Sequence, residues 1–497
     1  MLTEKENTWR DNRLEQIRQW EQHCKYPNFI DDNLIWTTIN QQTNPDKQKA
    51  FDIVAKARDN SSSGTMLSPQ DVAVLMNSDD PELWDAIFET ANWIKRHVYG
   101  NRIVLFAPVY VSSPCVNNCA YCGFRQENAK VKKSTLNMDE LKDEITALVD
   151  TGHKRTILVY GEHPLSDAQY ICQTIETVYT VKSGYGEIRR ANINAAPMFV
   201  PEYKDIRSAG IGTYQIFQET YHHDTYKKMH PKGTLKGEYA WRLFGLHRAI
   251  EAGIDDVAPD VLFGLYDWRF ELLAMLYHAM ALEKEFGIGP HTMSYPRMVS
   301  AVNTPLADHS RYLVSDNDFK KLVALIRLMC PYTGSILTAR EKPAMRHEVV
   351  KIGGVSQMDA GTRIGVGGYG QIKQENMPDK QQFIINDPRS LDDFVLALCQ
   401  QGYLPSFCTA GYREGRTGAN FMPLAKQASV KNFCIANGIL TFKEYLLDYA
   451  SPKVKQIGNE VVIPTFAKWI QQNVPQLAGE VTNKLKMEEH QQRDQHF

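Results

Sequence analysis

The chain has 497 residues, with 56 lysines and arginines against 58 aspartates and glutamates, which gives a net charge of −2 at pH 7. This balance gives no electrostatic reason to expect nucleic acid or an anionic membrane surface as a partner. Nine cysteines in a chain of this length favour a reducing compartment over a secreted disulfide framework. The start of the chain is charged, and no apolar stretch is long enough to cross a bilayer. We therefore expect a cytoplasmic protein of one large domain with extensions, or of several smaller domains.

The first part of the chain, residues 1–90, is predicted to be a helical N-terminal extension. Its clearest helix start lies at Ser68, a residue type that caps helices, followed by Pro69 and a run of apolar residues. Polar linkers separate this helix from the segments before it.

Residues 91–385 alternate short apolar strands with helix-length amphipathic stretches. This alternation predicts an α/β fold, a (β/α)8 TIM-type barrel or a partly open version of it. Polar residues recur at or just after the strand ends, where barrels place their chemistry. The expected strands are Ile103–Val111, Thr156–Tyr160, Arg189–Asn194, Thr213–Phe217, Asp256–Phe263, Pro290–Tyr295, Gly334–Leu337 and Val355–Asp359.

Residues 386–497 are predicted to form a C-terminal appendage of helices. It contains Cys408 and Cys434, and it ends in a polar tail, residues 484–497. Because terminal polar segments have few apolar side chains to bury, we expect this tail to fray.

The most specific pattern is a C-x3-C-x2-C run, in which Cys115, Cys119 and Cys122 follow the first barrel strand. Three thiolates hold three irons of a 4Fe-4S cluster and leave the fourth iron open to a cosubstrate. Zinc is the alternative, although it usually takes four closed ligands. The run resembles the radical S-adenosylmethionine (SAM) superfamily, whose open iron chelates SAM. Tyr121, inside the run, is expected to shield the cluster from water.

The second strand is followed by Gly161 and Glu162. This pair resembles the Gly-Glu element of radical SAM enzymes, in which backbone and carboxylate meet the ammonium group of SAM. A carboxylate suits that role because an ammonium offers three charged donors. The alternative is an ordinary turn in which Glu162 caps the next helix.

The fourth strand ends in Gln218 and Glu219, and three histidines follow, His222, His223 and His230. We assign Gln218 and Glu219 to a loop that binds the ribose of SAM and the substrate. Paired histidines beside carboxylates can bind a metal. An isolated histidine is more often structural, so we do not assign the three histidines as ligands.

Two arginines are candidates for binding a substrate carboxylate. Arg363 follows the last strand and Arg340 follows the seventh, and a guanidinium group matches a carboxylate with two parallel hydrogen bonds. Arg363 is the first choice and Arg340 the second. A structural salt bridge is an equally good interpretation of either one.

Several further segments together resemble the HydG family, the radical SAM tyrosine lyases of FeFe-hydrogenase maturation, which are relatives of the 2-iminoacetate synthase ThiH. The resemblance implies cleavage of the Cα–Cβ bond of tyrosine into p-cresol and dehydroglycine, with an electron donor such as ferredoxin or flavodoxin. HydG then converts dehydroglycine to carbon monoxide and cyanide on a second cluster. The segments that carry the resemblance are Asn101–Pro108, Cys119–Arg125, Glu219–His222, Leu262–Arg269, Gly289–Ser294 and Arg413–Gly418.

The chain departs from this family where HydG holds its second cluster with C-x2-C-x22-C. Cys408 and Cys434 stand at the outer positions, but Gly411 replaces the middle cysteine. Two thiolates would hold a four-iron cluster poorly, so we expect a weak, altered or absent cluster, with two buried thiols as the alternative. His291 is a candidate ligand for an extra iron, or a structural hydrogen-bonding group.

We therefore predict a radical SAM lyase acting on tyrosine or a similar aromatic amino acid. One alternative is a complete carbon monoxide and cyanide synthase whose second cluster survives with another ligand. Another is a carrier or scaffold for iron that performs no chemistry, although a carrier has no need of a SAM-binding site.

Overall fold

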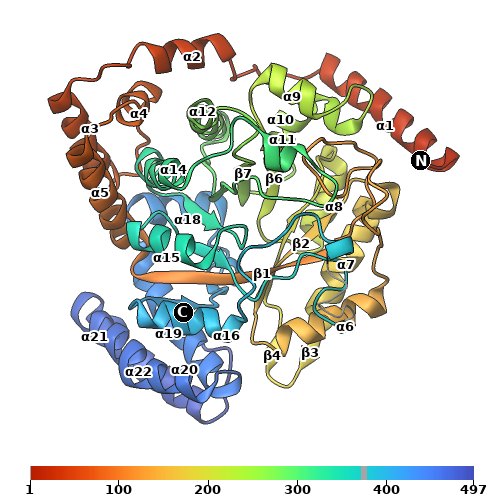
Figure 1. Ribbon diagram of the computed structural model, residues 1–497. Coiled ribbons are helices and arrows are strands. Elements are labelled where there is room, and N and C mark those ends of the chain that lie inside the picture. The colour runs from red at the N-terminus through yellow and green to blue at the C-terminus, as the bar shows by residue number, and fades with distance from the viewer. Residues whose placement is uncertain (1, 371–377) are drawn as a thin grey trace.

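The computed structural model describes residues 2–370 and 378–497 and is built around a closed parallel barrel (Figure 1). Strand β10 pairs with β1, so that the eight strands form a continuous ring. The predicted TIM-type barrel is confirmed, and all eight expected strands are present. The barrel strands are β1 (Arg102–Ser112), β2 (Arg155–Tyr160), β5 (Arg190–Asn194), β6 (Tyr214–Glu219), β7 (Val257–Val261), β8 (Thr292–Ser294), β9 (Gly334–Leu337) and β10 (Gln357–Asp359).

The helices that connect these strands cover the outside of the barrel with their apolar faces. Helix α6 begins with a capping box, in which Asn137 and Glu140 exchange hydrogen bonds with each other's backbone. A small hairpin, β3 (Lys182–Ser183) and β4 (Gly186–Glu187), lies outside the ring. The connecting helices are α6 (Met138–Val149), α7 (Ala168–Thr180), α8 (Val200–Ser208), α9 (His223–Met229), α10 (Tyr239–Leu243), α11 (Gly245–Glu251), α12 (Trp268–Phe286), α13 (Leu306–His309), α14 (Asp316–Met329) and α15 (Pro343–Ile352).

Five helices precede the barrel. Helix α4 begins at Pro69, and Ser68 caps it as the sequence predicts, accepting a hydrogen bond from the backbone of Asp71. Helix α5 packs against α14 of the barrel, which ties the extension to the main domain. The five are α1 (Glu4–Gln22), α2 (Asp32–Asn40), α3 (Lys47–Asn60), α4 (Pro69–Met76) and α5 (Pro81–Tyr99).

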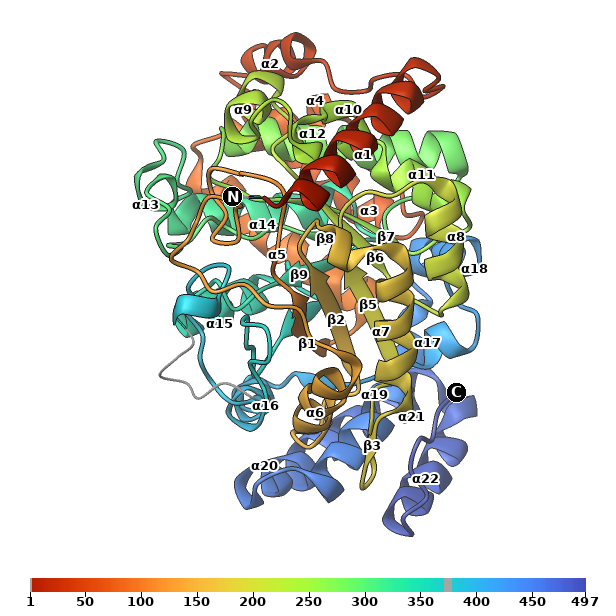
Figure 2. The same ribbon diagram turned by 90° about the vertical axis from the view of Figure 1, so that its right-hand side faces the viewer.

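The C-terminal region is joined to the barrel by a ninth strand, β11 (Leu404–Ser406), which pairs with the start of β1. The sequence does not reveal this strand, because it is three residues long and contains a proline. Figures 1 and 2 show α19–α22 gathered on the side of the molecule away from α1, α2 and α9. The helices are α16 (Leu391–Gln400), α17 (Ala410–Arg413), α18 (Gly418–Lys426), α19 (Val430–Asp448), α20 (Pro452–Ile457), α21 (Ile463–Asn473) and α22 (Pro475–Glu489).

The polar tail is held in place, contrary to the expectation that it frays. Helix α22 continues to Glu489, and Arg493 beyond it pairs with Asp448 at 2.6 Å. Asp494 pairs with Arg413 at 2.6 Å and with Arg189 at 3.0 Å. Charged side chains anchor this segment together with Leu485 and Phe497, which pack against the core.

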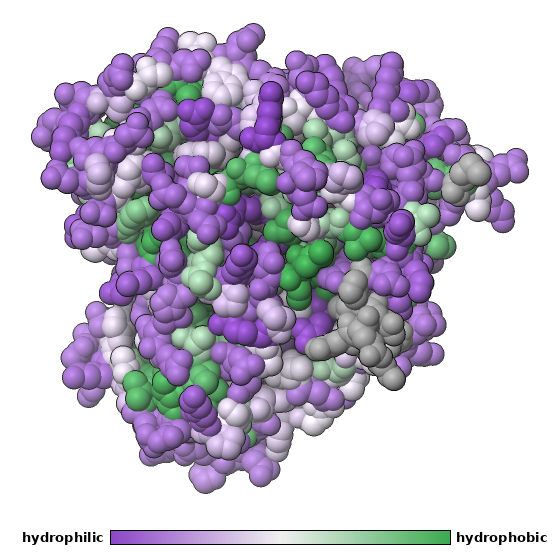
Figure 3. All heavy atoms as spheres, in the orientation of Figure 1, coloured by the Kyte–Doolittle hydropathy of each residue, from purple (hydrophilic) through white to green (hydrophobic). Residues whose placement is uncertain are grey.

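The face of the molecule seen in Figure 3 is mostly polar, with apolar residues gathered around a hollow near its centre. In the described part of the chain, no helix is long and apolar enough to cross a membrane.

Candidate active site

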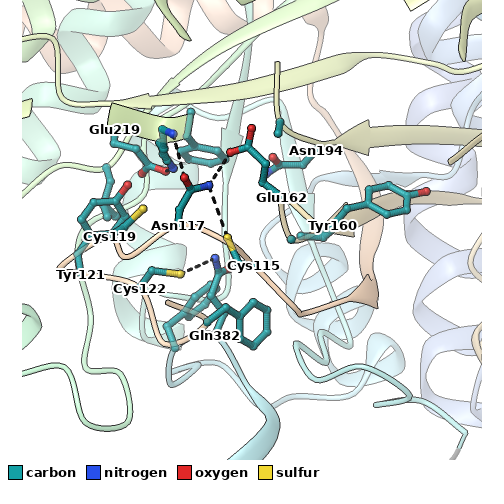
Figure 4. Close-up of a pocket in the computed structure, with 18 of the residues that line it drawn as sticks. Cys115, Asn117, Cys119, Tyr121, Cys122, Tyr160, Glu162, Asn194, Glu219 and Gln382 are labelled. Atoms are coloured by element: carbon teal, nitrogen blue, oxygen red, sulfur yellow. Dashed lines mark hydrogen bonds and ion pairs between the residues drawn. The ribbon is translucent and has the colours of Figure 1, made fainter. Parts of the chain in front are cut away.

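An open cavity of about 990 Å³, counted with its solvent-filled mouth, lies where the barrel strands end (Figure 4). Its walls come from residues at or after the carboxyl ends of β1, β2, β5, β6, β7, β8 and β9, the end of a TIM barrel that carries chemistry. The predicted site residues that line it are Cys115, Cys119, Tyr121, Cys122, Gly161, Glu162, Glu219 and Arg340.

Asn117 connects the cysteine loop to the other walls of the cavity. Its side-chain amide donates to Glu162 Oε2 at 2.5 Å and lies 3.7 Å from Cys115 Sγ. Its carbonyl oxygen accepts from the backbone N–H of Lys236 at 2.9 Å. Sequence reasoning missed Asn117, although its position between the first two cysteines was a usable signal.

Gln382 holds the other end of the cysteine loop. Its side-chain amide lies 3.4 Å from Cys122 Sγ, and its Oε1 accepts from the Tyr110 hydroxyl at 3.0 Å. Its backbone oxygen accepts from the N–H of Gly123, where an added Cβ would stand 2.4 Å from that oxygen. Only a glycine at position 123 allows the two backbone segments to come this close. No sequence motif pointed to Gln382, because it lies far along the chain.

The three thiols fit an iron–sulfur cluster. All three are free, and all face the cavity, whose described lining contains no fourth cysteine. Burial raises the pKa of Cys119 to about 12 and also raises the pKa of Cys115. A bound metal overcomes such a shift, because it deprotonates a coordinating thiol. The amides of Asn117 and Gln382 near sulfur are the kind of donors that tune such clusters.

Tyr121 forms one wall of the cavity and is fixed by His230. The Tyr121 hydroxyl lies 2.7 Å from His230 Nε2, and His230 Nδ1 lies 2.9 Å from the carbonyl oxygen of Tyr226. Since a carbonyl only accepts, Nδ1 carries the proton and Nε2 accepts from Tyr121. Burial lowers the pKa of His230 well below its ordinary value, so the ring is neutral.

Gly161 and Glu162 lie against the cysteine loop. A Cβ on Gly161 would stand 2.0 Å from the backbone oxygen of Pro114, so a larger residue would push the loop away. The backbone oxygen of Glu162 accepts from the N–H of Val116 at 2.9 Å. Beyond the contact of its Oε2 with Asn117, the Glu162 carboxylate has no hydrogen-bond partner among the described residues, which leaves Oε1 free for a ligand.

Glu219 reaches the cavity from a strained backbone position. Its φ is 72°, in the left-handed region, and the register between β6 and β7 shifts at this point. Lys236 Nζ lies 2.5 Å from Glu219 Oε1. Gln218, the preceding residue, is 3% exposed and does not line the cavity.

The two histidines after this turn contact the N-terminal extension. His223 Nδ1 lies 2.8 Å from Asp32 Oδ1, and His222 stacks on the ring of Tyr266 with 3.8 Å between centroids. Neither lines the cavity. His222 and His223 therefore have a structural role, since they connect the loop after β6 with α2 and with the loop after β7.

The two candidate arginines differ in position. Arg340 lines the cavity and also the adjoining lumen of the barrel, and its guanidinium stacks on Phe383 at 3.4 Å. No described residue forms an ion pair or hydrogen bond with this guanidinium. Arg363 lines neither space; its neighbours Thr362 and Ile364 face the lumen, and Arg363 donates to the backbone oxygen of Thr362 at 2.9 Å.

The C-terminal candidates meet at the opposite end of the barrel. Cys408, Cys434, His291 and Gly411 line one cavity near the amino ends of β1, β2, β9 and β10. A Cβ on Gly411 would have 4.0 Å to its nearest neighbour, the backbone oxygen of Arg416, so this glycine leaves open space. Two thiols without a third do not fit the three-thiolate pattern of a four-iron cluster.

His291 has structural partners in this cavity. Its Nε2 lies 3.4 Å from the Tyr412 hydroxyl, and its ring packs on Phe421 with 4.3 Å between centroids. Its Nδ1 lies 3.8 Å from Asp256 Oδ2. These contacts suit the structural interpretation of His291.

Family comparisons agree with this architecture. A model described as the Radical SAM superfamily matches residues 109–276, and one described as the Biotin and Thiamin Synthesis associated domain matches residues 294–404. The chain is 26% identical over 369 residues to the 2-iminoacetate synthase of Salmonella typhimurium, covering 74% of this chain and 91% of that protein. The barrel, the cysteine loop and these matches define a radical SAM enzyme.

Two solved structures are more similar. The crystal structure of HydG, a maturase of the [FeFe]-hydrogenase, shares 45% identity and a TM-score of 0.89, covering 95% of this chain and 100% of that chain. HydG from Carboxydothermus hydrogenoformans shares 36% identity and a TM-score of 0.76, covering 91% of this chain and 98% of that chain. The chain belongs to the HydG family, and the predicted resemblance is confirmed. Membership implies a 4Fe-4S cluster and SAM.

Proposed function

We propose that this protein is a radical SAM lyase that cleaves the Cα–Cβ bond of tyrosine, or of a similar aromatic amino acid, to p-cresol and dehydroglycine. The observation that carries the proposal is that the three thiols, the Glu162 carboxylate and the Arg340 guanidinium all open onto one cavity. That set supplies cluster ligands, a partner for an ammonium group and a partner for a carboxylate.

The cysteine loop and Glu162 form the half of the cavity that receives SAM. Cys115, Cys119 and Cys122 would hold the cluster, and Glu162 would accept hydrogen bonds from the amino group of SAM. When bound, the cluster would supply the electron for reductive cleavage of SAM into methionine and the 5′-deoxyadenosyl group that abstracts hydrogen. Asn117 fixes the separation between the cysteine loop and Glu162, because it contacts both the Cys115 sulfur and the Glu162 carboxylate.

Arg340 takes precedence over Arg363 as the group that holds the substrate carboxylate. Stacking on Phe383 fixes the plane of the Arg340 guanidinium, and no described carboxylate pairs with it. The lumen beside it is bordered by the apolar side chains of Phe106 and Ile336, which suit an aromatic ring. A carboxylate held at Arg340 would set the amino group of the substrate towards the SAM half of the cavity, and such positioning is a large part of radical catalysis.

The chain itself does not supply the electron. We propose a small electron-transfer protein such as ferredoxin or flavodoxin as the donor.

The complete synthesis of carbon monoxide and cyanide, the alternative function, requires a second cluster. The C-terminal cavity offers only Cys408 and Cys434 as thiol ligands among the described residues. A carrier without chemistry is disfavoured by the intact site around Glu162.

The test is anaerobic reconstitution with iron and sulfide, followed by incubation with SAM, reductant and a panel of aromatic amino acids. We expect 5′-deoxyadenosine and p-cresol to form together from tyrosine. Formation of 5′-deoxyadenosine without any carbon–carbon cleavage would contradict the lyase, and the absence of both products would contradict the radical SAM assignment. Carbon monoxide and cyanide are measured in the same reactions to separate the two enzymatic alternatives.

A further inference from the structure

Two of the three cysteines in the C-x3-C-x2-C run are covered from outside the barrel. Val116, the neighbour of Cys115, is buried in an apolar cluster with Leu14 of helix α1. Cys119 is buried in a second apolar cluster, to which the loops after β7 and β8 contribute. Cys122 is only partly buried. Outside the SAM half of the cavity, the cysteine loop is therefore approached most directly from the Cys122 side.

Three segments that are distant in the sequence meet on the surface beside Cys122. The N–H of Gly123 donates to the backbone oxygen of Gln382 at 3.1 Å, and the N–H of Ile384 donates to the backbone oxygen of Ser300 at 2.8 Å. These hydrogen bonds hold the segments side by side. We call the surface that they form the Cys122 face, and its segments are residues 123–133, 300–304 and 382–384.

The Cys122 face is positively charged. Its first segment carries four cations and one acid, and the other two segments carry no charged residue. Lys132 pairs with Asp379 at 3.3 Å, whereas the other three cations form no ion pair with a described residue. Since the whole chain has a net charge of −2, this positive charge is a local feature. The cations are Arg125, Lys130, Lys132 and Lys133, and the acid is Glu127.

Arg125 connects this charge to the cysteine loop. Its guanidinium donates to the carbonyl oxygen of Cys122 at 3.3 Å and to Thr304 Oγ1 at 2.8 Å. Lys133 Nζ donates to the carbonyl oxygens of Arg125 and Gln126 at 2.7 and 3.1 Å. All of these acceptors are neutral, so both positive charges remain uncompensated. A partner that contacts Arg125 is separated from Cys122 by a single side chain.

An exposed apolar residue lies on the same face. Ile384 is 44% exposed and is two residues from Gln382, whose amide lies 3.4 Å from Cys122 Sγ. Protein interfaces have apolar centres surrounded by polar and charged rims. Ile384 and the cations of the neighbouring segment form such a combination.

We propose that the Cys122 face docks an acidic electron-transfer protein, which delivers its electron to the cluster. In this step one electron leaves the reduced carrier and enters the cluster, and no bond or proton changes place. Opposite charges steer such a partner to this face and orient it there. The inference rests on the proposed function, because it names the surface at which the electron of that reaction enters.

The binding test is titration calorimetry of the anaerobically reconstituted protein with oxidised flavodoxin, an acidic carrier, as the probe. We expect saturable one-to-one binding that weakens as salt is added, because salt screens exposed charges. The double variant Lys130→Glu/Lys132→Glu, which changes two exposed side chains, should bind about tenfold more weakly at low salt. Lys453→Glu/Lys468→Glu is the matched control, since it makes the same change in net charge on exposed residues of α20 and α21 and should bind like the unaltered protein.

The turnover test compares two reductants. With reduced flavodoxin, Lys130→Glu/Lys132→Glu should need about tenfold more carrier to reach half its maximal rate of 5′-deoxyadenosine formation, with the maximal rate unchanged. With dithionite, a small reductant that needs no docking surface, this variant should match the unaltered protein. Absence of product from the unaltered protein with dithionite would contradict the proposed function, and the binding titration would still decide the docking surface.

Hydrogen exchange on the unaltered protein gives a readout that does not depend on the variants. Binding of flavodoxin should slow the exchange of backbone amides in segments 123–133 and 382–384. The proposal is overturned if flavodoxin gives no saturable heat, or if Lys130→Glu/Lys132→Glu binds as tightly as the control variant. Protection confined to other segments of the chain would also overturn it.

Discussion

At the residue scale, the three cysteines proposed to hold the cluster are the part of the candidate site that local sequence determines. Cys115, Cys119 and Cys122 lie within one short loop, so their spacing alone predicts that they face a common point. Asn117 and Gln382, which contact two of these sulfurs, carry no such signature. Gln382 reaches Cys122 only because the barrel brings together two segments 260 residues apart.

The first prediction concerns the cluster ligands. Cys119→Ala removes one of three thiols from the cavity and should abolish formation of 5′-deoxyadenosine, because a cluster needs all three ligands to keep one iron open. The measurement is 5′-deoxyadenosine by chromatography after anaerobic reconstitution. Cys172→Ala is the matched control, since Cys172 does not line the cavity. Activity in Cys119→Ala equal to that of the control would contradict the assignment.

The second prediction separates the two arginines. Arg340→Lys should raise the KM for tyrosine by about tenfold to a hundredfold, since one charged hydrogen bond to the carboxylate is lost, while the KM for SAM changes little. Arg363→Lys is the matched control and should leave both values unchanged, because Arg363 lines neither the cavity nor the lumen.

The reverse pattern, with only Arg363→Lys affecting tyrosine, would return the carboxylate site to the residue that the sequence favoured. The sequence ranked Arg363 first but gave no physical reason to exclude Arg340, because both arginines follow a strand end. Side chains along an extended segment point alternately into and out of the barrel. Which of the two arginines points inward is therefore known only once the positions of β9 and β10 are known.

At the element scale, the turn after β6 is held by a helix on the outside of the barrel. Glu271 of α12 is fully buried, accepts a short hydrogen bond from the Thr220 hydroxyl, and accepts from the backbone N–H of Tyr221 at 2.8 Å. This contact anchors the two residues after Glu219, whose left-handed backbone brings its carboxylate into the cavity. Sequence reasoning located the strand end but not the distant carboxylate that supports it.

The third prediction follows from the protonation of Glu271. Desolvation raises its pKa from 4.5 to about 8, so the folded protein keeps a proton that the unfolded chain loses. The folded state then binds more protons between these values, and the free energy of unfolding should fall by about 1.4 kcal/mol per pH unit as the pH rises through this window. The glutamine in Glu271→Gln cannot ionise, so this variant should lose the contribution of Glu271 to the pH dependence of the free energy of unfolding.

The measurement is urea unfolding of the unaltered protein and the variant at about pH 6 and about pH 7.5, within the window where the proton number differs. Glu82→Gln is the control, because the Glu82 side chain is 77% exposed and should leave the slope unchanged. An equal pH slope in Glu271→Gln and the unaltered protein would show that Glu271 is ionised in the folded state.

At the scale of the whole molecule, the alternation of strands and helices was sufficient to predict the barrel, but not how the ends of the chain attach to it. Strand β11 is too short for a period-two pattern, and ion pairs of Arg413 and Arg493 add to the few apolar contacts that hold the tail. Both features bring the C-terminal region against the amino ends of the barrel strands. The chain therefore carries a candidate site at each end of one barrel, with three thiols lining one cavity and two lining the other.

The last prediction concerns this difference. Reconstituted protein should carry about four irons, the content of a single 4Fe-4S cluster, and should form p-cresol with little carbon monoxide or cyanide. Gly411→Cys supplies the missing donor where the structure has room for it, with the nearest neighbour of the new Cβ at 4.0 Å. It should raise the iron content towards about eight and add a second cluster signal in the electron paramagnetic resonance spectrum.

Gly411→Ala is the matched control for this change. It fills the same space with a methyl group but offers no ligand, so its iron content should equal that of the unaltered protein. If the unaltered protein already carried two clusters and released both diatomic products, another ligand would be replacing the missing thiolate at Cys408 and Cys434. If Gly411→Cys gained no iron, the third thiolate would not be what limits the C-terminal site.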